Sequence, residues 1–407
     1  MRNNYKAAMD DWTEIRESVG PYEANQFIYE SFREGSLDRR KFSIVDAWDQ
    51  TIGRIELEHA KKMGFNWQRI SEAVGPLTTA NFQGVVQQFG FTNFMDAYDS
   101  PDFPFKQLIP MKPTKLVAGE RCPKYTEVIP TDGPGGDIRP EGEAFKWAEM
   151  RADFIQTPPV EDIGRMLGLT EEMVTADQVG DLADMNAKMG RYVGWQVEER
   201  GIDCIIDLNR TAHRHNRKGL GPVHSYDDDQ GLVAQDGGQG LHNFDNLSTN
   251  ALANYSDLNE LEQLFNQIVD PDTGRPIDIV PKHLIYPKAL QNTVDAILRA
   301  GLLLKGDYTE ASPNDVQTRY DNTYANRYQP VTSKFFRQRT NSDIIWYLGD
   351  ITRYAKRMEL FPIQVIEAPA LNPDHFARRI VLAWRAATAF AYVVWEPRAM
   401  CKSTGAS

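Results

Sequence analysis

The hydrophobic positions between residues 175 and 208 recur at helical spacing. Five of them step along the chain by three, three, four and three residues, which places them on one face of a single helix: Val179, Leu182, Met185, Met189 and Tyr192. Thr175 and Gln178 have the spacing of a capping box at its start. At about 1.5 Å per residue, about thirty residues form a helix of roughly 45 Å. A helix of this length predicts the frame of a broad domain.

Four glycines interrupt the predicted helix: Gly180, Gly190, Gly194 and Gly201. Inside a helix each costs about 1 kcal/mol relative to alanine. Four glycines with this cost in one helix predict that another element packs closely on the helix backbone. On its own, this stretch also fits a long core helix of an ordinary domain.

Residues 115–129 and 145–155 carry β-type residues on either side of the segment TDGPGGDIRPEGE, which is rich in glycine, proline and aspartate. This pattern predicts a long β-hairpin with a polar tip. A hairpin gains little stability from its own side chains, so we expect it to be supported by another chain. Before it, the prolines and aromatic residues of 101–113 predict a linker.

The other segments alternate between helical and extended patterns. Gly-Pro stops divide the first hundred or so residues into helices, and residues 209–239 form a polar, acidic loop. We then expect a helix over 256–269 capped by Ser256 with Glu260, a strand over 281–287, a helix over 289–300, mixed strands over 331–370 and a strand over 376–398. Because helices and strands are segregated, the predicted fold class is α+β.

Composition narrows the class of protein. A hydrophobic fraction of 41% and a charged fraction of 25% are typical of a globular chain, and a net charge of −12 disfavours avid binding of nucleic acid. Cys122, Cys204 and Cys401 form no CxxC pair, which is typical of a reduced protein without a zinc framework.

The first residues carry no apolar signal region, and the apolar runs 300–304 and 389–395 are too short to cross a bilayer. We expect a soluble protein made in the cytoplasm.

One segment has the residue types of a metal site. His213, His215 and His224 lie near Asp227, Asp228 and Asp229, and a His-x-His pair can hold zinc. However, Arg214, Arg217 and Lys218 in the same segment oppose a bound cation. A solvated loop is therefore the preferred interpretation, and a metal-dependent hydrolase using these histidines is kept as the least favoured alternative.

Other chemical motifs fail on spacing. The residues after Asp270 and Asp272 resemble the start of a calcium loop, but Arg275 and Pro281 occupy the positions that need glycine and glutamate. The glycine clusters near 133–136 and 237–240 lack the context of a phosphate-binding loop, and no GxSxG motif occurs. The sequence therefore predicts no catalytic, cofactor-binding or metal-ligating residue, no cofactor and no enzymatic activity.

The order of the segments resembles the major capsid proteins of tailed bacteriophages, which share the Hong-Kong-ninety-seven fold. Residues 143–208 look like the return strand of the family's extended loop running into its spine helix. The segment VDPDTGRPIDIVPKHLIYPKALQNTVDAIL (269–298) resembles the step into the axial domain, and 344–369 with 376–403 resembles the C-terminal strands. ANFQGVVQQFGF (80–91) is similar to the helix before the extended loop.

The resemblance implies a division of the chain into family domains. These are an N-terminal arm over 1–113, the extended loop over 114–160, a peripheral domain over 161–281 with its spine helix over 175–208, an axial domain over 282–372, and peripheral strands over 373–407. Residues 1–75 and the acidic loop 209–245 depart from the family pattern by their length.

The resemblance also implies a function. The protein would assemble with itself as pentamers and hexamers into an icosahedral shell around double-stranded DNA, as part of the virion, after synthesis in the host bacterial cytoplasm. Portal, scaffolding and decoration proteins are further partners that the resemblance implies. A nanocompartment of the encapsulin type, which encloses cargo enzymes, is the alternative with the same fold.

Overall fold

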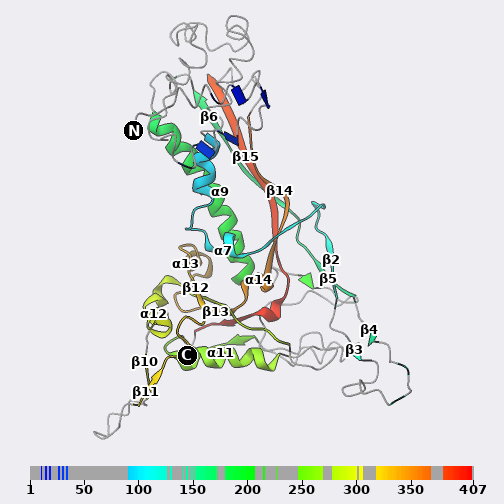
Figure 1. The fold of residues 1–407 in the computed structure, drawn as a ribbon, viewed down its shortest axis with the longest axis vertical. Coiled ribbons are helices and arrows are strands. Elements are labelled where there is room, and N and C mark those ends of the chain that lie inside the picture. Colours follow the sequence, from blue (N-terminus) through cyan, green and yellow to red (C-terminus); the bar gives the residue numbers. More distant parts are fainter. Residues whose placement is uncertain are drawn as a thin grey trace, which may run out of the picture. The chain divides into compact units, whose positions relative to one another are not determined.

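Figure 1 shows the fold of the protein as a computed structural model. The structure describes residues 11, 14–15, 18–19, 26–27, 30–31, 34, 90–125, 129–130, 141, 144, 148–149, 152–170, 172, 179–206, 214–215, 226, 246–268, 277–299, 302–305, 318–367 and 379–405. These residues form both helices and sheets, which confirms the α+β class.

The chain divides into two compact units, each assembled from segments that are distant in sequence. Unit 1 comprises Met1–Pro101, Asp162–Gln196 and Phe361–Ala389, and unit 2 comprises Asp102–Glu161, Val197–Leu360 and Phe390–Ser407. Four long elements contribute residues to both units: β6 (Glu161–Thr170), α9 (Val179–Ile206), β14 (Ala355–Glu367) and β15 (Ile380–Val394).

Helix α9 confirms the long helix predicted from the hydrophobic spacing, although residues 175–178 and 207–208 lie outside the described part of the chain. Its backbone is closely packed at Gly190, where an added Cβ would lie 2.2 Å from the carbonyl oxygen of Phe94. At Gly201 the nearest atom would be 3.4 Å away, so a methyl group fits there. The prediction of close packing is therefore confirmed at Gly190, whereas Gly201 has only ordinary contacts.

The core of unit 1 lies between α9, the helical residues 90–98 and strands β6 and β15. The indole N–H of Trp384 on β15 donates a hydrogen bond to Asn186 on α9, with a distance of 3.1 Å, and both side chains are buried. On β6, Arg165 donates to the hydroxyl of Tyr192 on α9 and lies over its ring. Figure 1 shows α9 running alongside these strands.

The predicted hairpin is confirmed by its strand pairing. Strand β2 (Arg121–Tyr125) pairs with β5 (Ala152–Gln156), and β3 (Ile129–Pro130) pairs with β4 (Ala148–Glu149), both antiparallel. The tip over 131–140 lies outside the described residues.

The loop predicted over 209–239 is ordered at two places that the structure describes, and there the interpretation of its histidine segment as a solvated loop is wrong. Strand β7 (Arg214–His215) adds a third strand to the hairpin by pairing with β5. Tyr226 is only 4% exposed, and its hydroxyl donates to the carbonyl of Ile205. A two-residue strand and one buried ring leave no periodic pattern in the sequence, because their partners come from other segments.

The expectation of a linker over 101–113 is also wrong. These residues form helix α7 (Pro104–Leu108) and strand β1 (Met111–Pro113), which pairs in parallel with β14. Phe103, Phe105 and Ile109 are buried. The prolines are compatible with this because Pro104 occupies the first turn of a helix and Pro113 an edge strand, where a missing N–H is tolerated.

A five-stranded sheet organises unit 2. Its order is β12 (Gln329–Val331), β9 (His283–Ile285), β13 (Trp346–Gly349), β16 (Met400–Ser403) and β8 (Leu247–Ser248). β9 is buried throughout, as expected for the segment 281–287. β8 and β16 lie outside 282–372, so the sheet extends beyond the residues assigned to an axial domain, whose limits stay a prediction.

Short elements complete unit 2. Helices α11 (Tyr255–Gln267) and α12 (Gln291–Arg299) confirm two predicted helices. The further elements are the 3₁₀ turns Lys288–Leu290 and Pro397–Ala399, the paired strands β10 (Leu302–Lys305) and β11 (Thr318–Asp321), and helices α13 (Phe336–Thr340) and α14 (Ile351–Tyr354). Helices α13 and α14 were not predicted, since a helix of four or five residues is too short to establish a hydrophobic period. Strand β6 was not predicted either.

The cap of α11 differs from the predicted one. Asn254, and not Ser256, is the N-cap: its side chain accepts a hydrogen bond from the backbone N–H of Ser256, and Asp257 accepts one from the N–H of Asn254. Both partners are present, so the capping box begins two residues earlier than expected.

Replacing Asn254 with alanine is expected to lower the free energy of unfolding by about 1 kcal/mol, because the first turn of α11 loses its cap. Urea unfolding of unassembled subunits measures this. The matched variant is Ser256→Ala, which we expect to cost clearly less. A larger loss for Ser256→Ala than for Asn254→Ala would contradict the observed cap.

Candidate functional site: the base of the hairpin

The two arms of the hairpin are joined before its strands begin. The N–H of Thr157 donates to the carbonyl of Glu120 at 2.9 Å, and the N–H of Glu120 donates to the hydroxyl of Thr157 at 2.7 Å. Farther from the tip of the hairpin, the N–H of Val160 donates to the carbonyl of Val117. We call residues 114–122 and 155–160 the hairpin base.

Gly119 makes the close approach of these arms possible. Its φ is +97°, a conformation that side-chain-bearing residues rarely adopt, and an added Cβ would lie 2.4 Å from the carbonyl oxygen of Thr157. Any larger residue at this position therefore has to separate the two arms.

The hairpin base is attached to strand β14. The N–H of Thr114 donates to the carbonyl of Glu359, and its hydroxyl donates to the carboxylate of Glu120 at 2.8 Å. Alongside, Cys122 and Ile155 form a buried cluster with Met358 and Val393. The hairpin therefore starts from a fixed position within unit 2.

Trp395 closes this cluster on one side. The ring packs against the buried residues, and the ammonium groups of Lys112 and Lys356 lie 4.5 and 3.7 Å from its centroid. Burial raises the pKa of the Cys122 thiol, and Lys112 only partly opposes this effect. Cys122, like Cys204 and Cys401, is a buried free cysteine, so it packs as a small apolar side chain and not as a thiolate.

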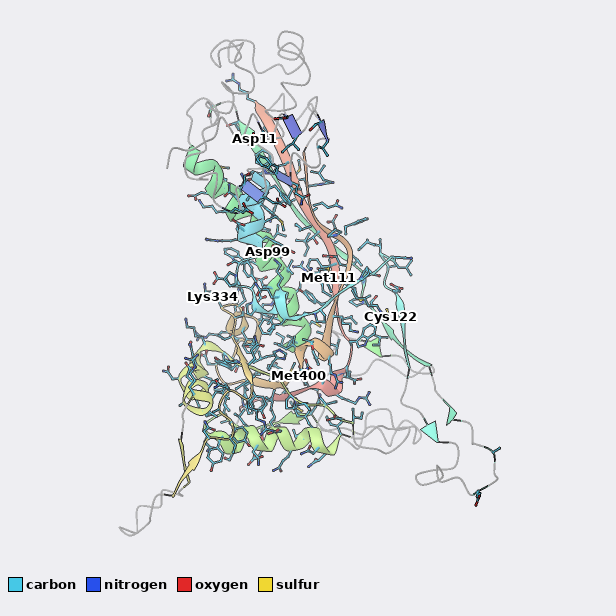
Figure 2. All side chains as sticks on the ribbon, in the orientation of Figure 1. Asp11, Asp99, Met111, Cys122, Lys334 and Met400 are labelled. Carbon is cyan, nitrogen blue, oxygen red and sulfur yellow. The ribbon has the colours of Figure 1, made fainter. Side chains whose placement is uncertain are left out.

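The first arm of the hairpin base and strand β1 before it expose apolar side chains. Met111, Leu116 and Val117 are 56%, 54% and 61% exposed. Figure 2 marks Met111 and Cys122 at this part of the molecule. Exposed apolar groups that gather on one segment are typical of a surface that contacts another molecule.

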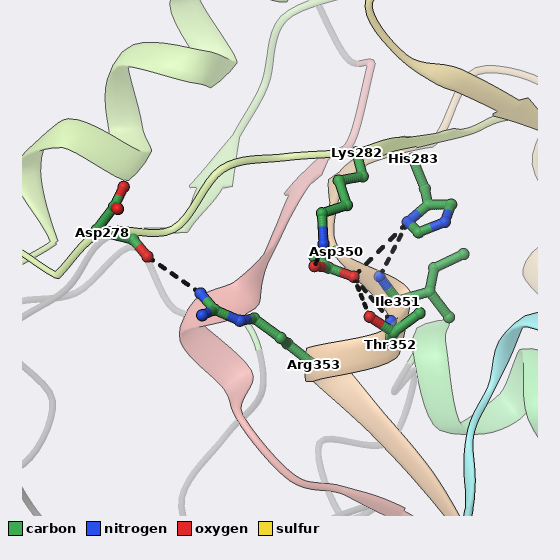
Figure 3. A network of polar contacts seen from close by, with 7 residues as sticks. All are labelled: Asp278, Lys282, His283, Asp350, Ile351, Thr352 and Arg353. Atoms are coloured by element: carbon green, nitrogen blue, oxygen red, sulfur yellow. Dashed lines mark hydrogen bonds and ion pairs between the residues drawn. The ribbon is translucent and has the colours of Figure 1, made fainter.

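A second polar constellation lies where β13 turns into α14 (Figure 3). The carboxylate of Asp350 is 1% exposed and accepts from Lys282 at 2.8 Å and from the hydroxyl of Thr352 at 2.6 Å. It also caps α14 by accepting the N–H of Thr352. On the other side, Nδ1 of His283 accepts the N–H of Ile351 at 3.3 Å.

The charges of this constellation follow from its surroundings. Burial alone raises the pKa of Asp350, but hydrogen bonds from Lys282 and Thr352 outweigh it and leave the pKa below its ordinary value. Burial lowers the pKa of His283, an effect that Asp350 only partly opposes. A neutral His283 and an ionised Asp350 are both occupied by backbone and side-chain bonds, so this arrangement fastens β9, β13 and α14 together.

The residues of neither constellation were predicted from the sequence. The Asp-Ile-Thr segment at 350–352 has the residue types of a helix cap, but the helix that it begins is only four residues long. Thr114, Glu120 and Thr157 carry no local signal, because each finds its partner across the hairpin or on β14.

The histidines of the proposed metal segment cannot be placed together. His213 and His224 lie outside the described residues, and for His215 the structure describes only the backbone of β7. Within the described part of the chain, no three histidine, cysteine or carboxylate side chains group so as to hold a metal ion. None of the described helices is long and apolar enough to cross a membrane.

Comparisons with known proteins assign the family. The model of a family described as phage capsid protein matches residues 155–403, which is more than half of the chain. No curated protein matches.

Several solved structures are similar in fold. A chain of Gordonia phage Cozz is 13% identical, with 74% of this chain and 85% of that chain covered and a TM-score of 0.42. A chain from the capsid of a native GTA particle is 12% identical, with 76% and 91% covered and a TM-score of 0.41. A chain of a virus-like particle from Pyrococcus furiosus is 8% identical, with 77% and 97% covered and a TM-score of 0.38.

At these identities and TM-scores the solved structures add nothing to the assignment, which rests on the family match alone. That match includes the long helix α9 and all five strands of the unit 2 sheet. The chain belongs to the phage capsid protein family.

Proposed function

We propose that this protein is the major capsid protein of a tailed double-stranded DNA phage, and that it assembles as pentamers and hexamers into an icosahedral shell. The observation that carries this proposal is the family match over 155–403. In this role the protein is structural, works without a cofactor and is not an enzyme. It would be made in the host cytoplasm and reside in the virion.

The hairpin supports a role in assembly. Its base is fixed by Thr114, Glu120 and Thr157, whereas the outer strands β3 and β4 pair over only two residues each. Such a projection lacks a core of its own. We infer that residues 114–160 act as the extended loop, which buries its outer part and the exposed Leu116 and Val117 against another copy.

The domain roles follow the same proposal. Residues 1–113 would form the arm, 161–281 and 373–407 the peripheral domain, and 282–372 the axial domain around each capsomer centre. The net charge of −12 suits a shell that confines DNA without adhering to it, because like charges repel across its inner surface. Portal, scaffolding and decoration proteins would be its further partners.

Electron microscopy and sedimentation velocity of the full chain expressed alone test the proposal. We expect closed shells, or rings of five and six subunits. A stable monomer or dimer at high concentration would contradict shell formation. Particles from the native source distinguish the two kinds of shell: nuclease-protected double-stranded DNA supports a phage head, and a protein cargo without DNA would favour a nanocompartment.

Shortening the hairpin tests its role separately. Deleting residues 132–136 is expected to leave the free energy of subunit unfolding within about 0.5 kcal/mol, because the sequence of this segment, DGPGG, offers no large hydrophobic side chain to a core. The same deletion should lower the yield or the urea resistance of shells, because contacts with another copy are lost. The matched control replaces Asp132–Gly136 with five glycine and serine residues, which retains the length. Shells of unchanged resistance in the deletion variant would refute the role.

A further inference from the structure

Glu198 is a buried carboxyl group that none of the roles above uses. It lies on α9 within unit 2, and its side chain is fully buried. Its Oε2 accepts the backbone N–H of Lys106 at 2.9 Å. Oε1 is buried as well and has no hydrogen-bond partner among the described residues.

The partner of Glu198 is a helix that cannot cap itself. The N-cap of α7 is Phe103, whose side chain makes no capping bond. Glu198 supplies the missing acceptor from 92 residues away in sequence, since the N–H of Lys106 in the first turn donates to its carboxyl group. The backbone of Phe105 also acts on this carboxyl group and lowers its pKa. The first turn of α7 is therefore capped by a side chain of α9.

The same carboxyl group reaches a second short helix. The hydroxyl of Ser333, a buried residue in the turn before α13, acts on this carboxyl group and lowers its pKa. Phe105 of α7 stacks on Phe336 of α13, with ring centroids 6.5 Å apart. A change at Glu198 is thus transmitted to both α7 and α13.

Little positive charge compensates a carboxylate at this position. The charged group of α7 that acts on Glu198 is the ammonium of Lys106, and its charge has the smallest effect of the five causes that shift the pKa of Glu198. Ser333 contributes only a neutral hydroxyl. Desolvation by burial outweighs all of them and raises the pKa of Glu198 to about 7. A buried carboxylate is costly unless it is fully paired, and here one oxygen is unpaired.

We propose that Glu198 is a proton-controlled latch on the segment that precedes the hairpin. The neutral carboxyl holds α7 and residue 109 against α9. Loss of the proton places an unpaired charge in the core, and water reaches that charge only when α7 detaches. Detachment frees the start of β1 and, through it, the connection to the hairpin base.

The direction of the pH effect follows from linkage. The folded site binds a proton more tightly than the same carboxyl in water, whose pKa is 4.5, so the seated state is favoured at low pH and loses its advantage as pH rises toward 7. With these two values, the equilibrium constant for detachment rises about tenfold between pH 6 and pH 8.

Hydrogen–deuterium exchange of the full chain as unassembled subunits tests the latch. Protection factors, which are corrected for the intrinsic pH dependence of exchange, are compared at pH 6 and pH 8. For the amides of residues 105–109 we expect a loss of about tenfold in protection at pH 8. Amides of α11 serve as an internal reference and should keep their protection. Equal protection of 105–109 at both pH values would overturn the proposal.

Variants identify the titrating group. Glu198→Gln, which cannot ionise, should abolish the tenfold change, whereas Glu199→Gln on the same helix should retain it. If Glu198→Gln fails to fold, Ser333→Ala replaces it: this variant removes a donor that favours the carboxylate, so the midpoint of the wild-type transition should move to higher pH. An unmoved midpoint, or a full pH response in a folded Glu198→Gln protein, would overturn the assignment. The readout needs no shells, so it is independent of the proposed function.

Discussion

Replacing Gly190 with leucine is expected to destabilise the subunit by about 3 kcal/mol or more and to reduce its soluble yield sharply. The first side-chain carbon alone would lie 2.2 Å from the carbonyl oxygen of Phe94 and 3.0 Å from its carbonyl carbon. These are backbone atoms of a packed helix, so they cannot turn aside as the end of a flexible side chain can. The helix of residues 90–98 must move away from α9.

The helix that moves carries much of the unit 1 core. Phe94 and Tyr98 on it are 1% and 4% exposed, with rings stacked at 6.0 Å. Displacing them disturbs the packing of a core to which α9 contributes the buried Met189 and Val193. The loss therefore combines strain at Gly190 with poorer packing around it.

A graded series measures this effect. Gly190→Ala should cost about 1–2 kcal/mol, since the clash is partly offset by the helix propensity gained on replacing glycine. The matched control is Gly201→Ala on the same helix, where the nearest atom would be 3.4 Å away. We expect that variant to be neutral or up to about 1 kcal/mol more stable. A Gly190→Leu protein that unfolds at the wild-type urea concentration would contradict the packing at this glycine.

Replacing Asp350 with alanine is expected to lower the free energy of unfolding by about 2–4 kcal/mol. Lys282 is 60% exposed, so the ion pair itself contributes little. Most of the loss comes from the cap of α14 and from the hydrogen bond that the Thr352 hydroxyl donates to the buried carboxylate.

The pH dependence of unfolding provides a second measure of the contribution of Asp350 to stability. Its pKa is lowered in the folded state, so its contribution is present above the unfolded value of 3.8 and is lost as pH falls through the folded value. The difference between wild type and Asp350→Ala should therefore be full at neutral pH and shrink in acid. Asp278→Ala is the control, because Arg353 binds only the backbone carbonyl of Asp278. Equal unfolding curves for wild type and Asp350→Ala at neutral pH would contradict the structural role of this carboxylate.

The two pH effects in unit 2 have opposite signs. Asp350 stabilises the folded state as an anion, because Lys282 and Thr352 bind it. Glu198 stabilises the folded state as a neutral acid, because its burial is not matched by a partner cation. Measuring unfolding of Asp350→Ala and Glu198→Gln across the same pH range separates the contributions of the two residues.

The sequence by itself determined the elements that a local pattern encodes. The hydrophobic spacing over 175–208 predicted α9, and β-type residues around a glycine-rich tip predicted the hairpin. Prolines at 281 and 287 marked the limits of β9. These signals are local, because the period of a helix and the preferences of proline depend only on neighbouring residues. Their order along the chain was enough to indicate the phage capsid family.

Only the tertiary structure decided which distant segments meet. Residues 101–113 have the composition of a linker, yet β1 within them pairs with β14, and Phe103 and Phe105 are buried in the core. Glu198 has the sequence context of a solvated helix face, yet it caps α7. The acceptor for an uncapped N–H, or the partner of an edge strand, can come from any part of the chain. Which segment supplies it depends on the fold as a whole, because burial in the folded core sets the cost of leaving each polar group unpaired.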